Sequence, residues 1–412
     1  MAGHCIIHGR LLIDPYEPPP LGWLAIEEGV IAEVGLGEPP EPPHFRGHER
    51  EAVICPGFID AHIHVPQIDA VGRGGFPLLT WLEEVIFPAE ARWSSPQWAA
   101  QQVDSFHRRL LHEGTLGYAG YLTSHQHGLG ILTENLRRWP LRSIAGQVLM
   151  DRAAPPSLLD QPIGPMRQSA DVRFTPSANP RFAVSCSNRC LALASELAHG
   201  QWPIQTHLAE SSEECSVVGE QFPSDSHYTA VYDRHGLLTP CTLLAHCIHL
   251  SDEEWQLIAD RHSVVVHCPA ANTFLESGVF DIGAAQRHGV RIALGSDVAA
   301  GPDVAMPRVA RSMIETAKFR RMTLDRTAPI PTPADAWWQI TTGNAEALGW
   351  GDAGRLSIGA AADVLLLELP FDIDEHLVSR LIYTWDPEWI TGRFVGGHPI
   401  SPEDLRKPGY TT

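Results

Sequence analysis

The chain has 412 residues, 44% of them hydrophobic, and a formal net charge of −19 at pH 7. This length fits one large α/β domain with a smaller one beside it. The negative charge argues against nucleic acid or an anionic membrane surface as a partner. No apolar run approaches the roughly 18 residues of a membrane-spanning helix, and the N-terminus resembles no secretory signal. With eight scattered cysteines and no Cys-x-x-Cys pair, we expect a cytoplasmic protein with reduced thiols.

Short strands separated by turn residues are predicted at both ends of the chain. The predicted strands cover residues 5–13, 22–26, 30–34, 362–367 and 389–395. We expect the two ends, residues 1–55 and 355–412, to pair into one small β-sandwich domain.

Between the ends, predicted strands alternate with predicted helices. Near-continuous apolar runs are typical of parallel strands buried on both faces. The predicted strands cover residues 117–122, 143–150, 181–185, 201–207, 241–246, 263–267 and 290–297, and the last four of them are such runs. The helices cover residues 79–87, 97–113, 281–288 and 306–320, and a capping box from Ser251 to Glu254 opens another. The pattern predicts an α/β fold, a (β/α)8 TIM-like barrel over residues 56–354 with its active site at the C-terminal strand ends.

One stretch inside this region interrupts the alternation. Residues 152–180 are rich in proline and polar side chains, which predicts a long loop. Such a loop is either a lid over a site or a surface excursion, and the sequence leaves both open.

Two histidines follow the apolar run over residues 52–59. If Asp60 to His64 is extended, side chains two positions apart point the same way, so His62 and His64 project together from a strand end. Such a pair offers a metal two nitrogen ligands. Alone it is weak evidence, because the chain has 21 histidines.

Further candidate ligands stand at later strand ends. His207, His246 and Asp297 each close a predicted strand. Imidazole nitrogen and carboxylate oxygen suit zinc, and a position left open for water makes such a site catalytic. A buried core role explains any one of these residues, but not all five at equivalent strand ends. Glu210, just beyond His207, either moves protons beside the metal or begins a solvated acidic run.

Other catalytic patterns are missing from the sequence. It contains no His-Glu-x-x-His, no His-x-Glu with Pro-Cys-x-x-Cys, no Gly-x-Ser-x-Gly and no Walker A loop. These absences leave the strand-end cluster as the main candidate for chemistry.

The same residues resemble the amidohydrolase superfamily over nearly the whole chain. The matching motifs are Pro-Gly-Phe-Ile-Asp-Ala-His-Ile-His, His-Leu-Ala-Glu, the histidine at 246, His-Cys-Pro from 267 and Gly-Ser-Asp ending at 297. The resemblance implies a metal site formed by His62, His64, His207 and Asp297. In two-metal members a carboxylated lysine usually bridges the metals, but the only lysines here are Lys318 and Lys407. We therefore expect one zinc per chain, which is the deaminase pattern.

Five further stretches resemble the guanine deaminase family. They are residues 64–67, residues 81–93 with a Phe-Pro-x-Glu element, residues 148–155, Pro180-Arg181-Phe182 and residues 297–301. The resemblance implies a hydrolase that deaminates guanine to xanthine and ammonia in purine catabolism or salvage. Guanine is neutral and planar, so Gln67 and Arg181 suit its polar edge and Phe182 suits its face. Without the resemblance, Arg181 fits a surface salt bridge and Phe182 a core aromatic.

The resemblance also implies roles for these residues. A zinc-bound hydroxide attacks the carbon that carries the amino group, while Asp297 takes the water's proton, His246 orients the water and Glu210 protonates ring nitrogen N3. The expected substrate contacts are His64, Gln67, Arg181, Phe182, His207, Glu210 and Asp297. Because Arg181 would not bind the metal, its loss is expected to leave thermal stability nearly unchanged.

Three departures from the family's pattern concern the outer wall of the pocket. The segment between Asp151 and Pro180 is shorter than usual, Cys247 stands where glycine is common, and Ala270-Ala271-Asn272 replaces Asn-Ser-Asn. They leave open a deaminase of another amino-heterocycle, such as a pterin or 8-oxoguanine. A non-catalytic scaffold of the same fold is a further alternative, disfavoured because every ligand is present. A homodimer is expected from the resemblance alone.

Overall fold

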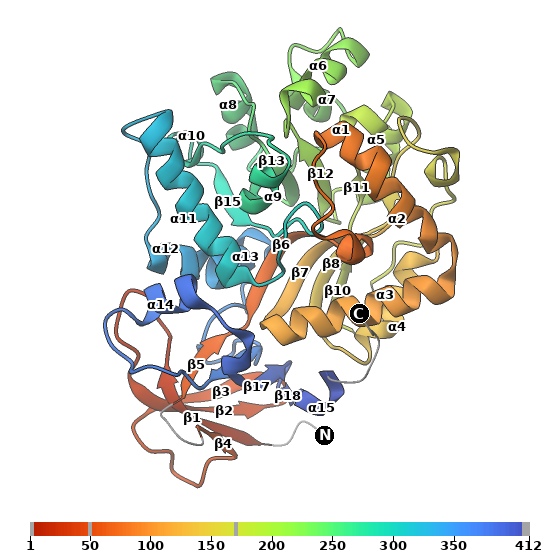
Figure 1. The fold of residues 1–412 in the computed structure, drawn as a ribbon. Helices are drawn as coiled ribbons and strands as arrows, with labels where there is room; N and C mark the ends of the chain where they lie inside the picture. Colours follow the sequence, from red (N-terminus) through yellow and green to blue (C-terminus); the bar gives the residue numbers. More distant parts are fainter. Residues whose placement is uncertain (1–3, 48–51, 169–171, 406–412) are drawn as a thin grey trace.

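The computed structural model describes residues 4–47, 52–168 and 172–405. Figure 1 shows a sheet built from both chain ends at the bottom and parallel strands with surrounding helices above it. Lys407 and the outermost parts of the predicted terminal domain, residues 1–3 and 406–412, lie outside the described residues, as do residues 48–51 and 169–171.

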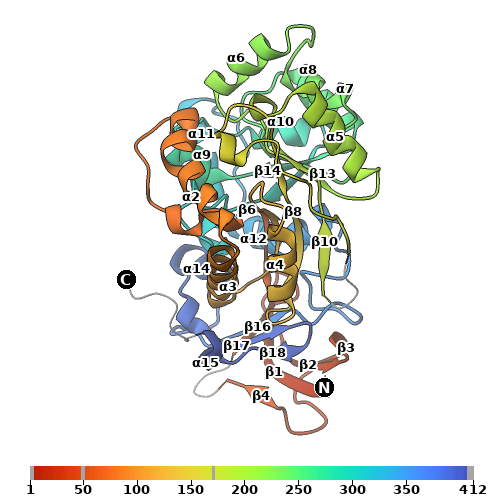
Figure 2. The ribbon, with the colours of Figure 1, turned by 90° about the vertical axis from the view of Figure 1, so that its right-hand side faces the viewer.

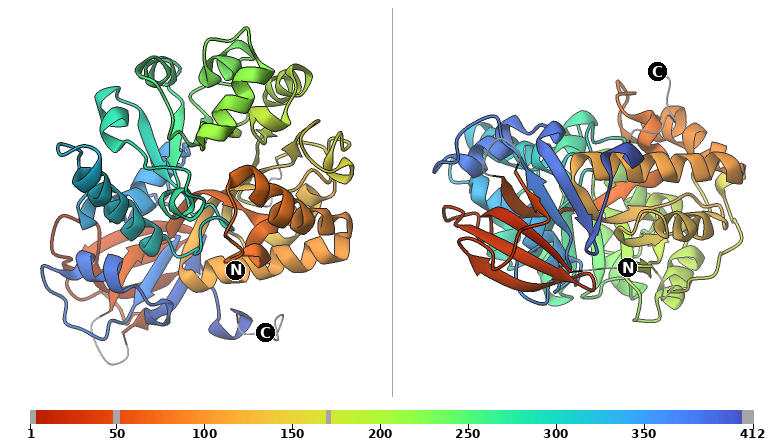
Figure 3. Two further views of the ribbon diagram at one scale, coloured as in Figure 1. Left: turned by 45° about the horizontal axis from the view of Figure 1, so that its top comes forward. Right: turned by 90° about the horizontal axis from the view of Figure 1, so that it is seen from below.

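Strands from both ends share one eight-stranded sheet with the order β18-β17-β16-β5-β1-β2-β3, and β4 pairs with β1. Its strands are β1 (Cys5–Leu11), β2 (Leu21–Glu27), β3 (Val30–Leu36), β4 (Phe45–Arg46), β5 (Val53–Pro56), β16 (Val364–Leu367), β17 (Ile390–Val395) and β18 (His398–Pro399). The ends join where β16 runs antiparallel to β5, with Leu365 opposite Cys55. The right panel of Figure 3 shows these red and blue strands side by side. The expected pairing of the two ends is confirmed, while the two-layer sandwich stays a prediction.

This terminal sheet has a hydrophobic core of its own. Ile7, Leu24, Ile54, Val364 and Phe394 are fully buried in one cluster, separate from the larger cluster in the rest of the molecule. Burial of apolar surface is the main favourable term in folding. Because both ends contribute to the cluster, neither end buries its apolar face alone.

Parallel strands occupy the middle of the chain, in sheets with the orders β10-β8-β7-β6, β11-β9 and β12-β13-β14-β15. They are β6 (Phe58–His64), β7 (Thr115–Tyr121), β8 (Arg142–Gly146), β9 (Val148–Leu149), β10 (Phe174–Pro176), β11 (Asn179–Pro180), β12 (Ile204–Leu208), β13 (Thr242–His246), β14 (Val264–His267) and β15 (Arg291–Leu294). A parallel bridge joins Ala178 to Ile204. The chain after β15 bonds back to β6, from Asp297 N to the His62 carbonyl at 2.8 Å. The predicted α/β class with parallel strands is confirmed.

Most helices lie around the parallel strands, while the short last helix lies beside the terminal sheet, as Figures 1 and 2 show. They are α1 (Leu78–Trp81), α2 (Phe87–Ala91), α3 (Pro96–Glu113), α4 (Gly128–Leu136), α5 (Asn188–Ala198), α6 (Ser212–Gln221), α7 (Tyr228–Arg234), α8 (Asp252–Asp260), α9 (Pro269–Phe274), α10 (Ile282–Arg287), α11 (Met306–Thr323), α12 (Pro333–Trp338), α13 (Asn344–Ala347), α14 (Leu377–Thr384) and α15 (Pro402–Leu405). The predicted capping box is confirmed, because Ser251 and Glu254 bond reciprocally at the start of α8. Within the described ranges, no helix combines the length and apolar character that crossing a membrane requires.

The structure corrects two strand predictions beside the site. Residues 181–185 do not form a strand; β11 ends at Pro180, and a 3₁₀ turn covers Ala183–Ser185. The hydroxyl groups of Tyr228 and Tyr232 accept the Ala183 N–H at 3.2 and 3.0 Å, in place of a strand partner.

The second correction concerns the last parallel strand, which stops at Leu294 rather than at Asp297. A Cβ on Gly295 would lie 2.6 Å from the Cβ of His62, so only glycine allows this close approach. Asp297 then adopts a left-handed φ of 52°. The loop predicted over residues 152–180 is confirmed for much of its described length, but it includes the short strands β10 and β11 and a 3₁₀ turn over Pro156–Leu158.

Candidate active site

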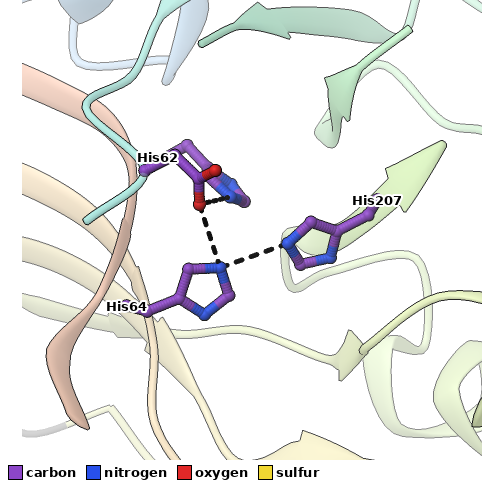
Figure 4. Close-up of side chains that lie close together, drawn as sticks. His62, His64 and His207 are labelled. Atoms are coloured by element: carbon purple, nitrogen blue, oxygen red, sulfur yellow. Dashed lines mark hydrogen bonds and ion pairs between the residues drawn. The ribbon is translucent and has the colours of Figure 1, made fainter. Parts of the chain in front are cut away.

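Four predicted ligands converge where β6 and β12 end. His62 and His64 lie on β6, His207 lies on β12, and Asp297 lies in the turn after β15. The Nε2 atoms of His64 and His207 are 3.2 Å apart. Oδ1 of Asp297 lies 3.2 Å from Nε2 of His62 and 3.3 Å from Nε2 of His64. Figure 4 shows the three imidazoles pointing toward one another, and all four residues are buried.

These distances suit a tetrahedral metal site. Zinc–nitrogen and zinc–oxygen bonds of about 2.0–2.1 Å place tetrahedral ligand atoms about 3.3 Å apart. Nε2 of His62 is buried without a hydrogen-bond partner, although burying an unpaired polar atom is costly. A metal bound at the centre would satisfy it, so the donor set fits zinc.

The charge states of these groups also suit metal binding. Burial lowers the pKa of His64 to about 4 and holds the pKa of His207 well below its ordinary value, so both rings are neutral. Burial alone would raise the pKa of Asp297, but its contacts with His62 and His64 outweigh burial and hold that pKa well below the usual range. His64 and His207 therefore offer neutral nitrogens, and Asp297 offers a carboxylate.

Groups behind the cluster fix its orientation. Oδ1 of Asp60 accepts the backbone N–H of His62 at 3.1 Å and of Ser296 at 3.0 Å, which ties β6 to the turn carrying Asp297. Nδ1 of His207 donates to the carbonyl of Arg181 at 2.6 Å. A carbonyl only accepts, so this bond leaves the lone pair of His207 on Nε2, facing the cluster.

His246 and Glu210 stand beside the cluster. Nε2 of His246 lies 3.5 Å from Oε2 of Glu210 and 3.8 Å from Oδ2 of Asp297. Nδ1 of His246 bonds Oδ1 of Asn272 at 2.9 Å. Burial, reinforced by the negative charges of Asp297 and Glu214, raises the pKa of Glu210 well above its ordinary value. A buried carboxyl that stays protonated near neutral pH can donate a proton.

A buried glutamate supports Glu210 from behind. Oε2 of Glu214 accepts the backbone N–H of Glu210 at 2.8 Å, and Oε1 accepts the Tyr228 hydroxyl at 2.7 Å. Ser277 Oγ donates to Oε1 of Glu210 at 3.3 Å. These bonds hold the Glu210 side chain and backbone beside His246.

All predicted substrate contacts line one cavity. Its walls are His64, Gln67, Leu78, Trp81, Leu82, Arg181, Phe182, His207, Glu210, His246, Leu275, Asp297 and Ala300. The predicted site residues therefore meet in one place, although they come from widely separated parts of the chain.

Several neighbours were missed from the sequence. Glu90, on α2, is fully buried and contacts both Gln67 and Arg181; the Phe-Pro-x-Glu element that resembles the family was its only signal. Glu214 closes a capping box with Ser211, a signal visible in Ser-x-x-Glu. No local pattern indicated Asn272.

The structure also bears on the number of metals. His246, Cys268 and Asp297 form a second buried set within metal-binding reach, and it shares Asp297 with the first. Lys318 lies on α11, where its Nζ donates to the Tyr383 hydroxyl at 3.1 Å, so it is not a bridging ligand.

Comparisons with known proteins agree on the family. Residues 53–400 match the model of the Amidohydrolase family. A guanine deaminase from Escherichia coli (strain K12) is 31% identical over 385 residues, 87% of this chain and 86% of that protein. The crystal structure of guanine deaminase from C. acetobutylicum with bound guanine superposes with a TM-score of 0.89 at 27% identity, covering 97% of this chain and all of that one. A zinc-bound adenosine deaminase from Xanthomonas campestris, at 24% identity and a TM-score of 0.80 over 96% of this chain and 92% of that one, shows the shared fold.

Proposed function

Because this chain belongs to the amidohydrolase family and, within it, to the guanine deaminases, we infer that it hydrolyses guanine to xanthine and ammonia. One observation carries this inference. The His/Asp cluster and the polar pair Gln67 and Arg181 line the same small cavity. A planar base held by that pair would present its far edge to the cluster.

We infer one zinc per chain, held by His62, His64, His207 and Asp297. Such a zinc would supply a water whose pKa is lowered from 15.7 to about 7. Asp297 is ionised and faces the centre of the cluster, so its carboxylate can take a proton from that water. His246, whose Nε2 lies near Asp297, is placed to orient the water and to stabilise charge that develops on it.

Glu210 would act as the proton donor to the purine base. Its raised pKa keeps a proton available, which Glu210 can deliver to ring nitrogen N3 before helping the amine leave as ammonia. Gln67 and Arg181 would hold the opposite edge, so that the amino-bearing carbon faces the cluster. Phe182 on the cavity wall would pack against the face of the base.

Several finer features belong to the same proposal. We infer that the parallel sheets close into a (β/α)8 barrel, supported by the hydrogen bond between Asp297 and His62. The barrel domain would span residues 56–354, and residues 1–55 and 355–412 would form the flanking β-sandwich. We further propose a cytoplasmic homodimer; light scattering on the purified protein would test the dimer.

A panel of bases tests the substrate. We expect the zinc-loaded protein to release ammonia from guanine much faster than from adenine, pterin or 8-oxoguanine, because a site that bonds polar edges penalises ligands that leave them unpaired. Faster release from a pterin or from 8-oxoguanine would favour the alternative deaminase. No release from any base would favour the scaffold.

Metal analysis tests the stoichiometry. We expect one zinc per chain in the active protein, because no lysine stands in the cluster. Two tightly bound metals, both needed for activity, would contradict this and would implicate the set of His246, Cys268 and Asp297.

A further inference from the structure

A buried carboxylate joins the two residues that are proposed to hold the base. Glu90 is 0% exposed and Arg181 is 3% exposed. Nη1 of Arg181 lies 2.9 Å from each carboxylate oxygen of Glu90. Nε2 of Gln67 donates to Oε1 of the same carboxylate at 2.8 Å. Glu90 therefore contacts both Gln67 and Arg181, although it does not itself line the cavity.

These bonds fix which atoms face a ligand. Nε2 of Gln67 points to Glu90, while Oε1 accepts the backbone N–H of Ala299 at 3.3 Å, so the amide has one defined orientation. Glu90 bonds Nη1 of Arg181, so its contacts do not use the Nε and Nη2 donors of that side chain, which lines the cavity. Gln67 and Arg181 thus present donors and an acceptor in a fixed pattern.

The pair also sets the charge of this wall. A guanidinium next to an empty cavity would attract anionic ligands, but Glu90 balances the charge of Arg181 within the protein. We propose that Glu90 is a positioning residue that makes this wall bind neutral bases in preference to anionic ones. The inference rests on the proposed function, and it adds the rule by which the site rejects bases that are ionised at neutral pH.

The test compares two purine-like ligands that lack the amino group to be hydrolysed. Hypoxanthine is neutral at pH 7.5, and 8-azaxanthine is an anion there. Dissociation constants would be measured by calorimetry on the metal-loaded protein. We expect Glu90→Gln to shift the ratio of affinities toward the anion by roughly 10- to 100-fold, because a nearby unit charge acts through an effective dielectric constant of about 20. An unshifted ratio in the folded variant would overturn the proposal.

Matched variants separate charge from structure. Glu90→Asp keeps the charge and should keep the wild-type ratio even if both affinities fall. If Glu90→Gln does not fold, the unchanged protein is compared with the double variant Glu90→Gln/Arg181→Gln, which removes both charges together. If Glu90 balances Arg181, the ratio of affinities should stay within about threefold of the unchanged protein; a shift of about tenfold or more away from the anion would show that the charge of Arg181 was not balanced and would overturn the role.

Ammonia release from guanine by the unchanged protein is measured separately, so the two failures are distinguishable. If the unchanged protein turns over guanine but Glu90→Gln does not shift the ratio of affinities, the role of Glu90 is wrong and the proposed function stands. If Glu90→Gln shifts the ratio of affinities but the unchanged protein does not turn over guanine, the role of Glu90 stands and the proposed function is wrong.

Discussion

Two clusters contribute residues to the wall of the cavity, and they differ in how completely the protein satisfies their hydrogen bonds. In the metal-side cluster of His62, His64, His207 and Asp297, a buried ring nitrogen of His62 has no hydrogen bond. In the base-side cluster of Gln67, Glu90 and Arg181, both oxygens of Glu90 are bonded by its neighbours. On our proposal a bound metal would complete the first cluster, whereas the fold itself completes the second.

This difference predicts that substitutions in the two clusters affect different properties, activity in one and stability in the other. The metal-side residues are proposed to bind a metal that catalysis needs. Substituting one of these residues should therefore lower activity more than it lowers the free energy of unfolding. A buried ion pair closed within the protein is different, because removing one partner leaves the other charge uncompensated. Substitutions on the two sides should therefore separate activity from stability.

The largest effect is expected at Asp297. Asp297→Asn removes both an anionic ligand and the proposed proton acceptor, so kcat should fall by more than the ~10²–10⁴-fold typical of losing one acid–base group. Metal content should fall with it. Ammonia release and elemental analysis measure both.

Asp233→Asn is the matched control, because Asp233 pairs with Arg261 on the exposed surface. It should change neither quantity. An Asp297→Asn protein with full metal content and a kcat within about tenfold of normal would remove Asp297 from the mechanism.

Glu210→Gln comes next. The amide keeps the size of the side chain but cannot shuttle a proton, so kcat should fall about 10²–10⁴-fold. Metal content should stay constant, because Glu210 is not in the ligand cluster. Steady-state kinetics and metal analysis test the pair of expectations.

Glu213→Gln is the control, because Glu213 lies in α6, just after Glu210 in the chain, and is exposed. If Glu210→Gln turns over guanine as fast as Glu213→Gln, Glu210 is not the proton donor.

The metal side could be predicted from the sequence, and the base side only in part. The apolar runs locate the strands, and parallel strands put their C-terminal residues at one edge, so His62, His64 and His207 could be assigned together. Asp297 was expected at a strand end but lies three residues beyond β15. Its position depends on the close approach of Gly295 to His62, which periodicity does not report.

The Glu90–Arg181 pair is a different case. The two residues are 91 positions apart and come from α2 and the turn after β11. Nothing local in either segment specifies that contact. Without the resemblance, Arg181 fitted a surface salt bridge; the pair is in fact buried, which changes the expectation for its substitution.

Arg181→Ala therefore sharpens the comparison. It should lower kcat/KM for guanine by roughly 10- to 100-fold, the worth of a hydrogen bond to a charged group. It should also lower the free energy of unfolding by about 3–5 kcal/mol, because Glu90 is left buried without its cation. Metal content should persist, since the carbonyl of residue 181 that holds His207 is main chain.

Two comparisons control this prediction. Arg261→Ala removes an exposed ion pair and should cost about 1 kcal/mol or less. The substrate 2-aminopurine lacks the oxygen that Arg181 would contact, so its turnover should be poor in the unchanged protein and little affected by Arg181→Ala. If Arg181→Ala has unchanged guanine kinetics, Arg181 does not bind the polar edge of guanine, and Gln67 is the remaining proposed polar contact there.

The smallest effect is expected at Asn272, which touches neither the metal-side nor the base-side cluster. Its Oδ1 bonds Nδ1 of His246 at 2.9 Å, and His246 carries a left-handed φ of 72°, so both the backbone of His246 and the bond at Nδ1 hold the ring. Asn272→Ala should free the ring and cost about tenfold in kcat, the equivalent of one net hydrogen bond of about 1.4 kcal/mol. KM and metal content should stay near normal, because neither Gln67, Arg181 nor a metal ligand is disturbed.

Asn272→Asp keeps an acceptor oxygen and should recover most of the loss in kcat. Thr273→Ala, which removes a hydroxyl bonded to Pro269 within the same helix, should leave kcat unchanged. If Asn272→Ala and Thr273→Ala have the same kcat, the orientation of His246 does not depend on Asn272, and the backbone at His246 alone sets it.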